Sequence, residues 1–172
     1  MQKNWIRLPL QGAHNVRELG GIPCLCGQTA WRHFLRSYEL SELTGPDIRF
    51  LLDYGVTTVI DLRSPGEIER TPDHPDLQKA VAYHRIPFID EDVSPEAQAD
   101  FMKKLPGLWE LYEYFLAQKN AVRKIFETIA AAPEGAILFH CTAGKDRTGI
   151  TALLLLMLAG ADTQDCQANY MQ

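Results

Sequence analysis

The ten residues His140-Cys141-Thr142-Ala143-Gly144-Lys145-Asp146-Arg147-Thr148-Gly149 decide the fold that we predict for this chain. A short apolar run, residues 136–139, precedes them, and a longer one, residues 150–159, follows them. This order predicts a buried strand, a tight loop and a helix in direct succession. Such a unit is typical of domains in which helices cover a mainly parallel sheet.

The loop between the two apolar runs begins with Cys141 and closes with Arg147, with five residues between them. Backbone N–H groups in such a loop point inward, and the N-terminus of the following helix adds positive potential, so the loop suits a phosphate group. The planar guanidinium of Arg147 can hold two phosphate oxygens. The same field favours the thiolate form of Cys141, which could then attack phosphorus. A buried structural cysteine and a surface arginine at a helix start are the alternatives.

Three segments of the chain resemble a known family. The Cys-x5-Arg loop is similar to that of the cysteine-dependent protein tyrosine phosphatases, and HCTAGKDRTG resembles one bacterial branch of them. That branch holds tyrosine and dual-specificity phosphatases similar to mycobacterial protein tyrosine phosphatase B, some of which also act on phosphoinositides. Residues 15–21, NVRELGG, resemble the branch's NxRxxGG signature, and residues 61–67, DLRSPGE, resemble its DLRSxxE signature.

The resemblance implies a hydrolase that removes phosphate from phosphotyrosine, with phosphoserine and phosphothreonine as an extension, through a phosphocysteine intermediate. The catalytic residues would be the nucleophile Cys141, the phosphate-orienting Arg147, and Asp146, which would protonate the leaving oxygen or order the attacking water. The expected substrate-binding residues are Thr142, Ala143, Gly144, Lys145, Asp146 and Arg147. Lys145 would face a second phosphate, which would favour phosphoinositides, or would be a solvated loop lysine.

The general acid stays open at this point. Many tyrosine phosphatases bring it from a separate loop, and Asp90 and Asp92 lie in an acidic segment that would serve, although such segments are more often solvated surface. We rank Asp146 first.

Four further residues are expected to support the loop, namely His140, Thr148, Asp61 and Arg63. His140 would order the loop from behind, and Thr148 would donate a hydrogen bond to the Cys141 sulfur or only cap the helix. Asp61 and Arg63 would brace the loop from a neighbouring strand end, or form an ion pair with no catalytic part.

Length and composition predict one domain over residues 1–172. The alternation of predicted strands and helices indicates an α/β fold with a mainly parallel sheet, and the resemblance implies the phosphotyrosine phosphatase II type. With 46% hydrophobic and 23% charged residues, the chain fits an ordinary globular protein. A net charge of −5 argues against a broad nucleic-acid surface.

The N-terminus lacks a secretory apolar segment, and residues 150–161 are too short to span a bilayer, so we expect a cytoplasmic protein with no transmembrane segment. Leaderless secretion remains the alternative.

The four cysteines are too few and too irregularly spaced for a disulfide scaffold, which also favours a reducing cytoplasm. Cys24 and Cys26 have no matching second pair, so we expect a hairpin there, and neither a metal nor a cofactor. Reversible oxidation would let Cys24, Cys26 or Cys166 form a disulfide with Cys141.

Hydrophobic patterns predict strands at 4–8, 22–26, 29–35, 56–61 and 80–87, the second and third joined by a turn at Gly27-Gln28. Helices are expected from Thr44 to Gly55, from Ser64 to Arg70, up to about 104, from 108 to 131, and over 150–161, with a loop over residues 71–75. Asp61 and Cys141 both fall at the carboxyl ends of strands, where open α/β sheets bind ligands.

Residues 163–172 resemble a helix that has only begun. Members of the resembled family usually continue for several more helices. We therefore expect a truncated chain, a disordered or cleaved remainder, or an unusually short variant. Missing helices would leave an apolar face open and would favour a homodimer.

Two other functions compete with a tyrosine phosphatase. One is a lipid phosphatase acting on phosphoinositides with little activity on proteins. The other is a phosphate-binding module or fragment with poor turnover, although such modules often lose the cysteine or the arginine, and both are present here. A sulfurtransferase also uses a cysteine in an anion-binding loop, but the string from Cys141 to Gly149 fits it poorly.

Overall fold

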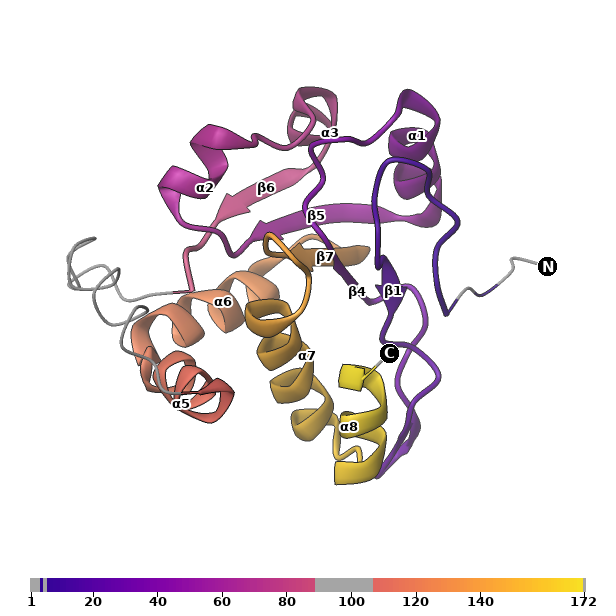
Figure 1. Ribbon diagram of the computed structural model, residues 1–172. Helices are drawn as coiled ribbons and strands as arrows, with labels where there is room; N and C mark the ends of the chain where they lie inside the picture. The colour runs from indigo at the N-terminus through magenta and orange to yellow at the C-terminus, as the bar shows by residue number, and fades with distance from the viewer. Residues whose placement is uncertain (1–3, 5, 89–106, 172) are drawn as a thin grey trace.

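The computed structural model describes residues 4, 6–88 and 107–171, which form three layers with a sheet in the middle (Figure 1). The five-stranded sheet has the order β1-β4-β7-β5-β6. Its strands are β1 (Arg17–Glu18), β4 (Phe34–Ser37), β7 (Ala136–His140), β5 (Val56–Asp61) and β6 (Ala82–Arg85). Within this sheet, β1 pairs with β4 antiparallel and the other described pairings are parallel. The predicted α/β fold with a mainly parallel sheet is confirmed.

Helices cover both faces of the sheet. One face carries α1 (Gly45–Tyr54) and α3 (Pro75–Ala80), and the opposite face carries α5 (Leu108–Ala117), α6 (Lys119–Ala131) and α7 (Asp146–Ala159). The short helix α2 (Pro65–Arg70) follows β5, and α8 (Thr163–Met171) packs on α7.

The central strand β7 divides the apolar core into two clusters. All five of its residues are buried, as expected for a strand covered on both faces. Successive side chains point to opposite faces of a sheet. Leu138 therefore packs with α1 and α3, while Phe139 packs with α5, α6 and α7.

The predicted hairpin lies two residues earlier than expected. β2 (Pro23–Cys24) pairs with β3 (Gly27–Gln28), so the turn falls between them rather than at Gly27-Gln28. Thr29 sets this register, because its hydroxyl accepts from the N–H of Ile22 at 3.0 Å and donates to the carbonyl of Leu19. The strand expected over residues 29–35 begins later than predicted, at Phe34 of β4.

Three other elements differ from the prediction. The helix expected over 108–131 is two helices, because Gln118 leaves helical dihedrals (φ −77°, ψ 67°) and its side chain donates to the carbonyl of Tyr114 at 3.1 Å. Part of the expected 71–75 loop starts α3, where Pro75 takes the first helical position and the His74 ring accepts from the N–H of Asp76. The strand expected at 4–8 is an isolated bridge at Arg7.

The helices expected from Thr44 and Ser64 and the strand expected over 56–61 are confirmed. The acidic loop and the helix expected between residues 90 and 104 lie outside the described residues.

No helix in the described ranges is long and apolar enough to cross a membrane. Large exposed apolar side chains near the chain end include Met157 and Leu158 on α7 and Met171 on α8. A homodimer through this face stays a prediction.

We expect Asp47→Ala to lower the free energy of unfolding by about 1–3 kcal/mol. This carboxylate is 3% exposed, and it accepts the N–H groups of Gln11, Gly12 and Thr44 at 2.9 Å each, so truncation leaves those donors unsatisfied. Urea denaturation measures the loss. Asp53→Ala, at an exposed position of the same helix, is the matched control, and equal losses in both variants would contradict the expectation.

Candidate active site

The loop between β7 and α7 lies at the carboxyl end of the central strand, beside the ends of β4 and β5. Ser37 of β4 and Asp61 of β5 both pair with His140, the last residue of β7. Gly144 has a φ of +63°, and a Cβ there would lie 2.5 Å from the carbonyl oxygen of Ser37. Only glycine therefore fits this point of the loop.

Donors outside the loop hold two of its carbonyl groups. The carbonyl of Thr142 accepts from the N–H of Glu39 at 3.3 Å, and that of Gly144 accepts from Arg36 Nη2 at 3.0 Å. Within the described part of the chain, the N–H groups of residues 142–148 donate no hydrogen bond. A run of unpaired N–H groups that continues into a helix N-terminus is a ready site for an anion.

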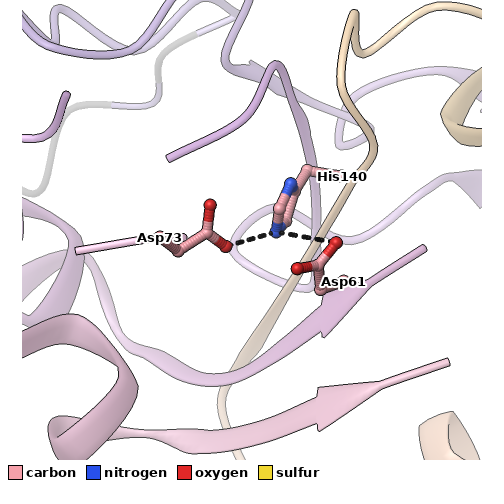
Figure 2. Close-up of side chains that lie close together, drawn as sticks. All are labelled: Asp61, Asp73 and His140. Carbon is pink, nitrogen blue, oxygen red and sulfur yellow. Dashed lines mark ion pairs between the residues drawn. The ribbon is translucent and has the colours of Figure 1, made fainter. Parts of the chain in front are cut away.

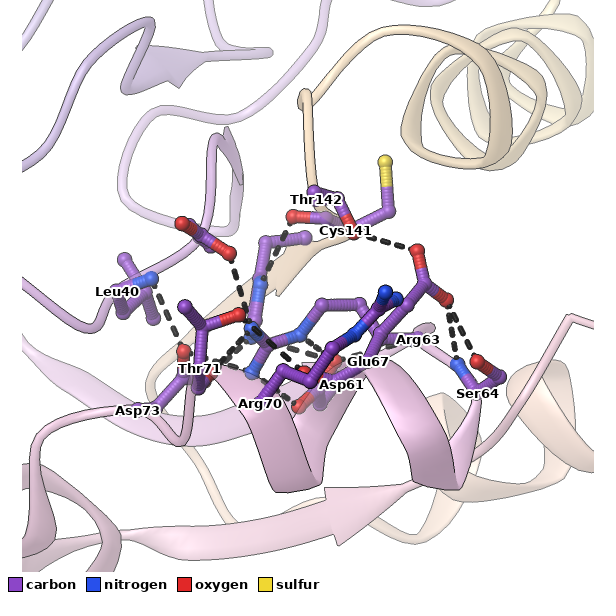
Figure 3. A network of polar contacts seen from close by, with 12 residues as sticks. Leu40, Asp61, Arg63, Ser64, Glu67, Arg70, Thr71, Asp73, Cys141 and Thr142 are labelled. Atoms are coloured by element: carbon purple, nitrogen blue, oxygen red, sulfur yellow. Dashed lines mark hydrogen bonds and ion pairs between the residues drawn. The ribbon is translucent and has the colours of Figure 1, made fainter.

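Arg147 is held by Glu67 of α2. Its Nη1 and Nη2 donate to the two carboxylate oxygens of Glu67 at 2.7 Å each. Glu67 also accepts from the Thr142 hydroxyl at 2.6 Å, and from the N–H and hydroxyl of Ser64 (Figure 3). Burial alone would raise the pKa of Glu67, but the contacts with Arg147 and Thr142 hold it well below its usual range. One carboxylate thus ties the guanidinium and the start of the loop to α2.

A fully buried charged cluster, comprising Asp61, Arg63, Asp73 and His140, lies beneath the loop. His140 Nε2 lies 2.8 Å from Asp73 Oδ2 and 3.8 Å from Asp61 Oδ1 (Figure 2). Arg63 donates to both oxygens of Asp61, at 2.9 and 2.8 Å, and to Asp73 at 2.8 Å. The Tyr83 hydroxyl of β6 donates to both carboxylates. The cluster therefore joins the ends of β5 and β7 to each other and, through Tyr83, to β6.

The buried cluster contains three residues of metal-binding type, Asp61, Asp73 and His140, whose ligand atoms lie within 4.8 Å of one another. The guanidinium of Arg63 already donates to both carboxylates and supplies their positive counter-charge. Burial would lower the pKa of Arg63, but the two carboxylates raise it above its ordinary value. We therefore interpret the cluster as an ion-pair network that supports the loop.

The cluster places three predicted supporting residues behind the loop. His140 Nδ1 lies 3.3 Å from the carbonyl oxygen of Cys141, and Asp61 and Arg63 reach the loop through His140 and Asp73. Asp73 was not predicted from the sequence, because it lies in a segment with two prolines that indicates a loop.

Asp146 lies at the start of α7 and is half-buried. Its Oδ1 accepts from the hydroxyl of Tyr112 on α5 at 3.0 Å and from that of Tyr170 on α8 at 3.3 Å, and the two hydroxyls also contact each other. Burial and these contacts raise the pKa of Tyr112 above its ordinary value. Neither tyrosine was predicted from the sequence, because they come from α5 and α8, which are distant from the loop along the chain.

The other predicted loop residues are placed as follows. Cys141 is 2% exposed and Thr148 is buried, whereas Ala143 and Lys145 are exposed. The hydroxyl of Thr148 has no hydrogen-bond partner among the described residues, so its bond to the Cys141 sulfur stays a prediction.

The alternative acids Asp90 and Asp92 lie outside the described residues. All four cysteines are free thiols, with Cys24 at the end of β2, Cys26 exposed in the turn that follows, and Cys166 buried on α8. Disulfide formation with Cys141 stays a prediction.

We expect acid to destabilise the protein through Asp73. Burial would raise the pKa of Asp73, but His140, Tyr83 and Arg63 lower it from 3.8 to about 2. The folded state then binds fewer protons than the unfolded state between these values, so the stabilisation is complete above about pH 4 and is lost as the pH falls through about 2. Urea denaturation at pH 7, 4 and 2.5 measures this loss.

Asp73→Asn is the informative variant for this pH dependence. We expect it to be less stable than the natural chain at pH 7 and to lose less stability on acidification. Asp53→Asn, at an exposed position, is the control and should keep the natural slope. An unchanged slope in Asp73→Asn would refute the assignment.

Comparison with known proteins gives consistent matches. The model of a family described as the tyrosine phosphatase family matches residues 8–172. A tyrosine-protein phosphatase of Nostoc commune is 37% identical over 142 residues, covering 80% of this chain and 47% of that protein. The triple specificity protein phosphatase PtpB of Mycobacterium tuberculosis is 29% identical over 198 residues, covering 95% of this chain and 67% of that protein.

A solved structure of a putative phosphatase from Neisseria meningitidis shares the fold. It has a TM-score of 0.50 and 19% identity, and the match covers 81% of this chain and 82% of that one. The chain spans about half the length of the Nostoc commune relative.

Proposed function

The chain belongs to the tyrosine phosphatase family, and from this premise we propose that it removes phosphate from phosphotyrosine by way of a phosphocysteine intermediate. One observation carries the proposal. The buried Cys141 lies in a loop whose N–H groups are unpaired within the described residues, and whose arginine is already fixed by Glu67. This combination supports a nucleophile that faces a bound phosphate.

In the first step, the Cys141 thiolate attacks phosphorus, a sulfur–phosphorus bond forms, and the bond to the tyrosine oxygen breaks. The leaving oxygen takes a proton from a general acid. In the second step, water attacks the phosphocysteine, gives a proton to the general base, and releases inorganic phosphate and the thiolate. Asp146 is the proposed acid and base, because two tyrosine hydroxyls hold its carboxylate at the start of α7, next to the loop.

Arg147 would bind the phosphate oxygens and stabilise the charge of the transition state. Its two-point contact with Glu67 supports this role, because a guanidinium held in place loses less rotational freedom when the phosphate arrives.

A phosphoinositide is the second candidate substrate. Lys145 is exposed in the loop and forms no ion pair within the described residues, so its charge is available to a second phosphate group. The mycobacterial relative is named a triple specificity phosphatase, which supports testing several substrate classes.

We also propose that the protein works in a reducing cytoplasm, where its four free thiols persist. The homodimer is proposed to use the exposed Met157 and Leu158, which burial against a second copy would remove from water.

The first test is phosphate release from a phosphotyrosine peptide and from a panel of phosphoinositides, with and without a chelator. We expect release that resists the chelator, and we expect Cys141→Ser to lose at least about a thousandfold in rate because the serine hydroxyl stays protonated. Cys24→Ser is the matched control. No release from any substrate by a folded protein would favour a phosphate-binding module instead, and chelator-sensitive release would contradict the thiolate mechanism.

We expect Glu67→Gln to lower kcat/KM by about tenfold to a hundredfold, because a neutral amide cannot accept two charge-assisted hydrogen bonds from Arg147. Steady-state kinetics on the preferred substrate measures the effect. Glu69→Gln, on the exposed side of the same short helix, is the control and should keep the natural rate. Equal rates in both variants would show that Glu67 does not prepare the arginine.

A further inference from the structure

Arg36 of β4 is a buried cation without an anionic partner among the described residues. Its side chain is 2% exposed. Nη1 donates to the carbonyl of Asn169 at 3.3 Å and to its side-chain oxygen at 3.0 Å, and Nη2 donates to the carbonyl of Gly144. All of these acceptors are neutral, and Nε is buried without a hydrogen-bond partner. Burying a charge without an opposite charge is costly, so a compensating anion is expected nearby.

The surroundings of Arg36 increase the need for an anion. Arg17 of β1 is paired directly with Arg36 across the sheet, so both side chains leave the same face, and Arg17 is 8% exposed with Nη1 unpartnered. The other titratable groups that interact with Arg36 are Cys141 in the loop, Tyr112 on α5 and Tyr170 on α8. Burial and Arg17 lower the pKa of Arg36 to about 10, so it remains charged at neutral pH.

The Asp146 carboxylate accepts from Tyr112 and Tyr170 rather than from Arg36. During the proposed reaction, the loop of residues 141–147, here called the phosphate-binding loop, carries a further anion. That anion is first the Cys141 thiolate and then the bound phosphate. The loop also receives the hydrogen bond from Arg36 at Gly144, which keeps that carbonyl engaged from outside the loop. If the carbonyl oxygen of Gly144 turned into the loop instead, it would repel a bound phosphate.

We propose that Arg36 is a positioning residue whose buried charge is balanced by the anion in the phosphate-binding loop and whose hydrogen bond holds that loop open to phosphate. The inference rests on the proposed function and assigns to β4 a part in it. Asn169 completes the arrangement by fixing the guanidinium from α8 without neutralising it.

The test uses anion binding, which does not require turnover. We expect inorganic phosphate to protect Cys141 from alkylation by iodoacetamide, followed at that residue by mass spectrometry. The concentration that gives half protection reports the affinity for phosphate. Three variants of the full chain are compared with the natural one. Arg36→Met removes the charge, Arg36→Lys keeps it, and Asn169→Asp leaves Arg36 in place but adds a carboxylate beside it.

We expect Arg36→Met to weaken phosphate binding by about tenfold, the order expected for one charge in a partly buried site, and to move the pH profile of alkylation upward. Arg36→Lys should recover part of the affinity. Asn169→Asp should weaken binding several-fold while raising the melting temperature, because it gives the buried cation a partner. A purely structural role for Arg36 predicts no loss in Asn169→Asp.

Natural affinity in both Arg36→Met and Asn169→Asp would overturn the proposal. If Arg36→Met does not fold, the phosphate affinity of Asn169→Asp tests the proposal alone, and a natural affinity in that variant would overturn it. A natural chain that binds phosphate but releases none from any substrate would refute the proposed function alone, since the affinities would still report on Arg36.

Discussion

The ion pairs of Arg63 with Asp61 and Asp73 are the constraint on which the rest of the site depends. Taking three charges and a histidine out of water is costly, and such a cluster is weak evidence for stability by itself. We infer that it contributes specificity, because the carboxylates and the guanidinium are brought together by β5, β6 and the segment before α3 in one arrangement. His140 extends that arrangement to the residue before Cys141.

Above this cluster, separate elements fix different atoms of the loop. α2 holds Arg147 and Thr142 through Glu67, β4 holds Gly144 through Arg36, and α5 and α8 hold Asp146 through two hydroxyls. The loop has few internal contacts of its own, and its N–H groups remain available within the described chain. The shape of the loop is therefore imposed from outside, by its contacts with α2, β4, α5 and α8.

The fold and the loop could be predicted from the sequence because both depend on local spacing. Apolar runs on either side of the segment from Cys141 to Arg147 determine a strand, a loop and a helix, and the 61–67 signature contains Glu67. Asp73, Arg36, Asn169, Tyr112 and Tyr170 could not be predicted, because each acts across a tertiary contact and has no spacing that marks it. The hairpin was misplaced for the same reason, since a threonine hydroxyl sets its register.

The strand order has a consequence for how the chain reaches this state. β7 lies between β4 and β5, yet it follows β5 in sequence by more than seventy residues. Until β7 has been synthesised, β4 and β5 each expose an edge whose parallel partner is missing. Contacts between such distant segments form slowly, and open strand edges invite pairing with other chains. The nascent protein is therefore most vulnerable to aggregation just before β7, the strand that leads into the Cys141 loop, enters the sheet.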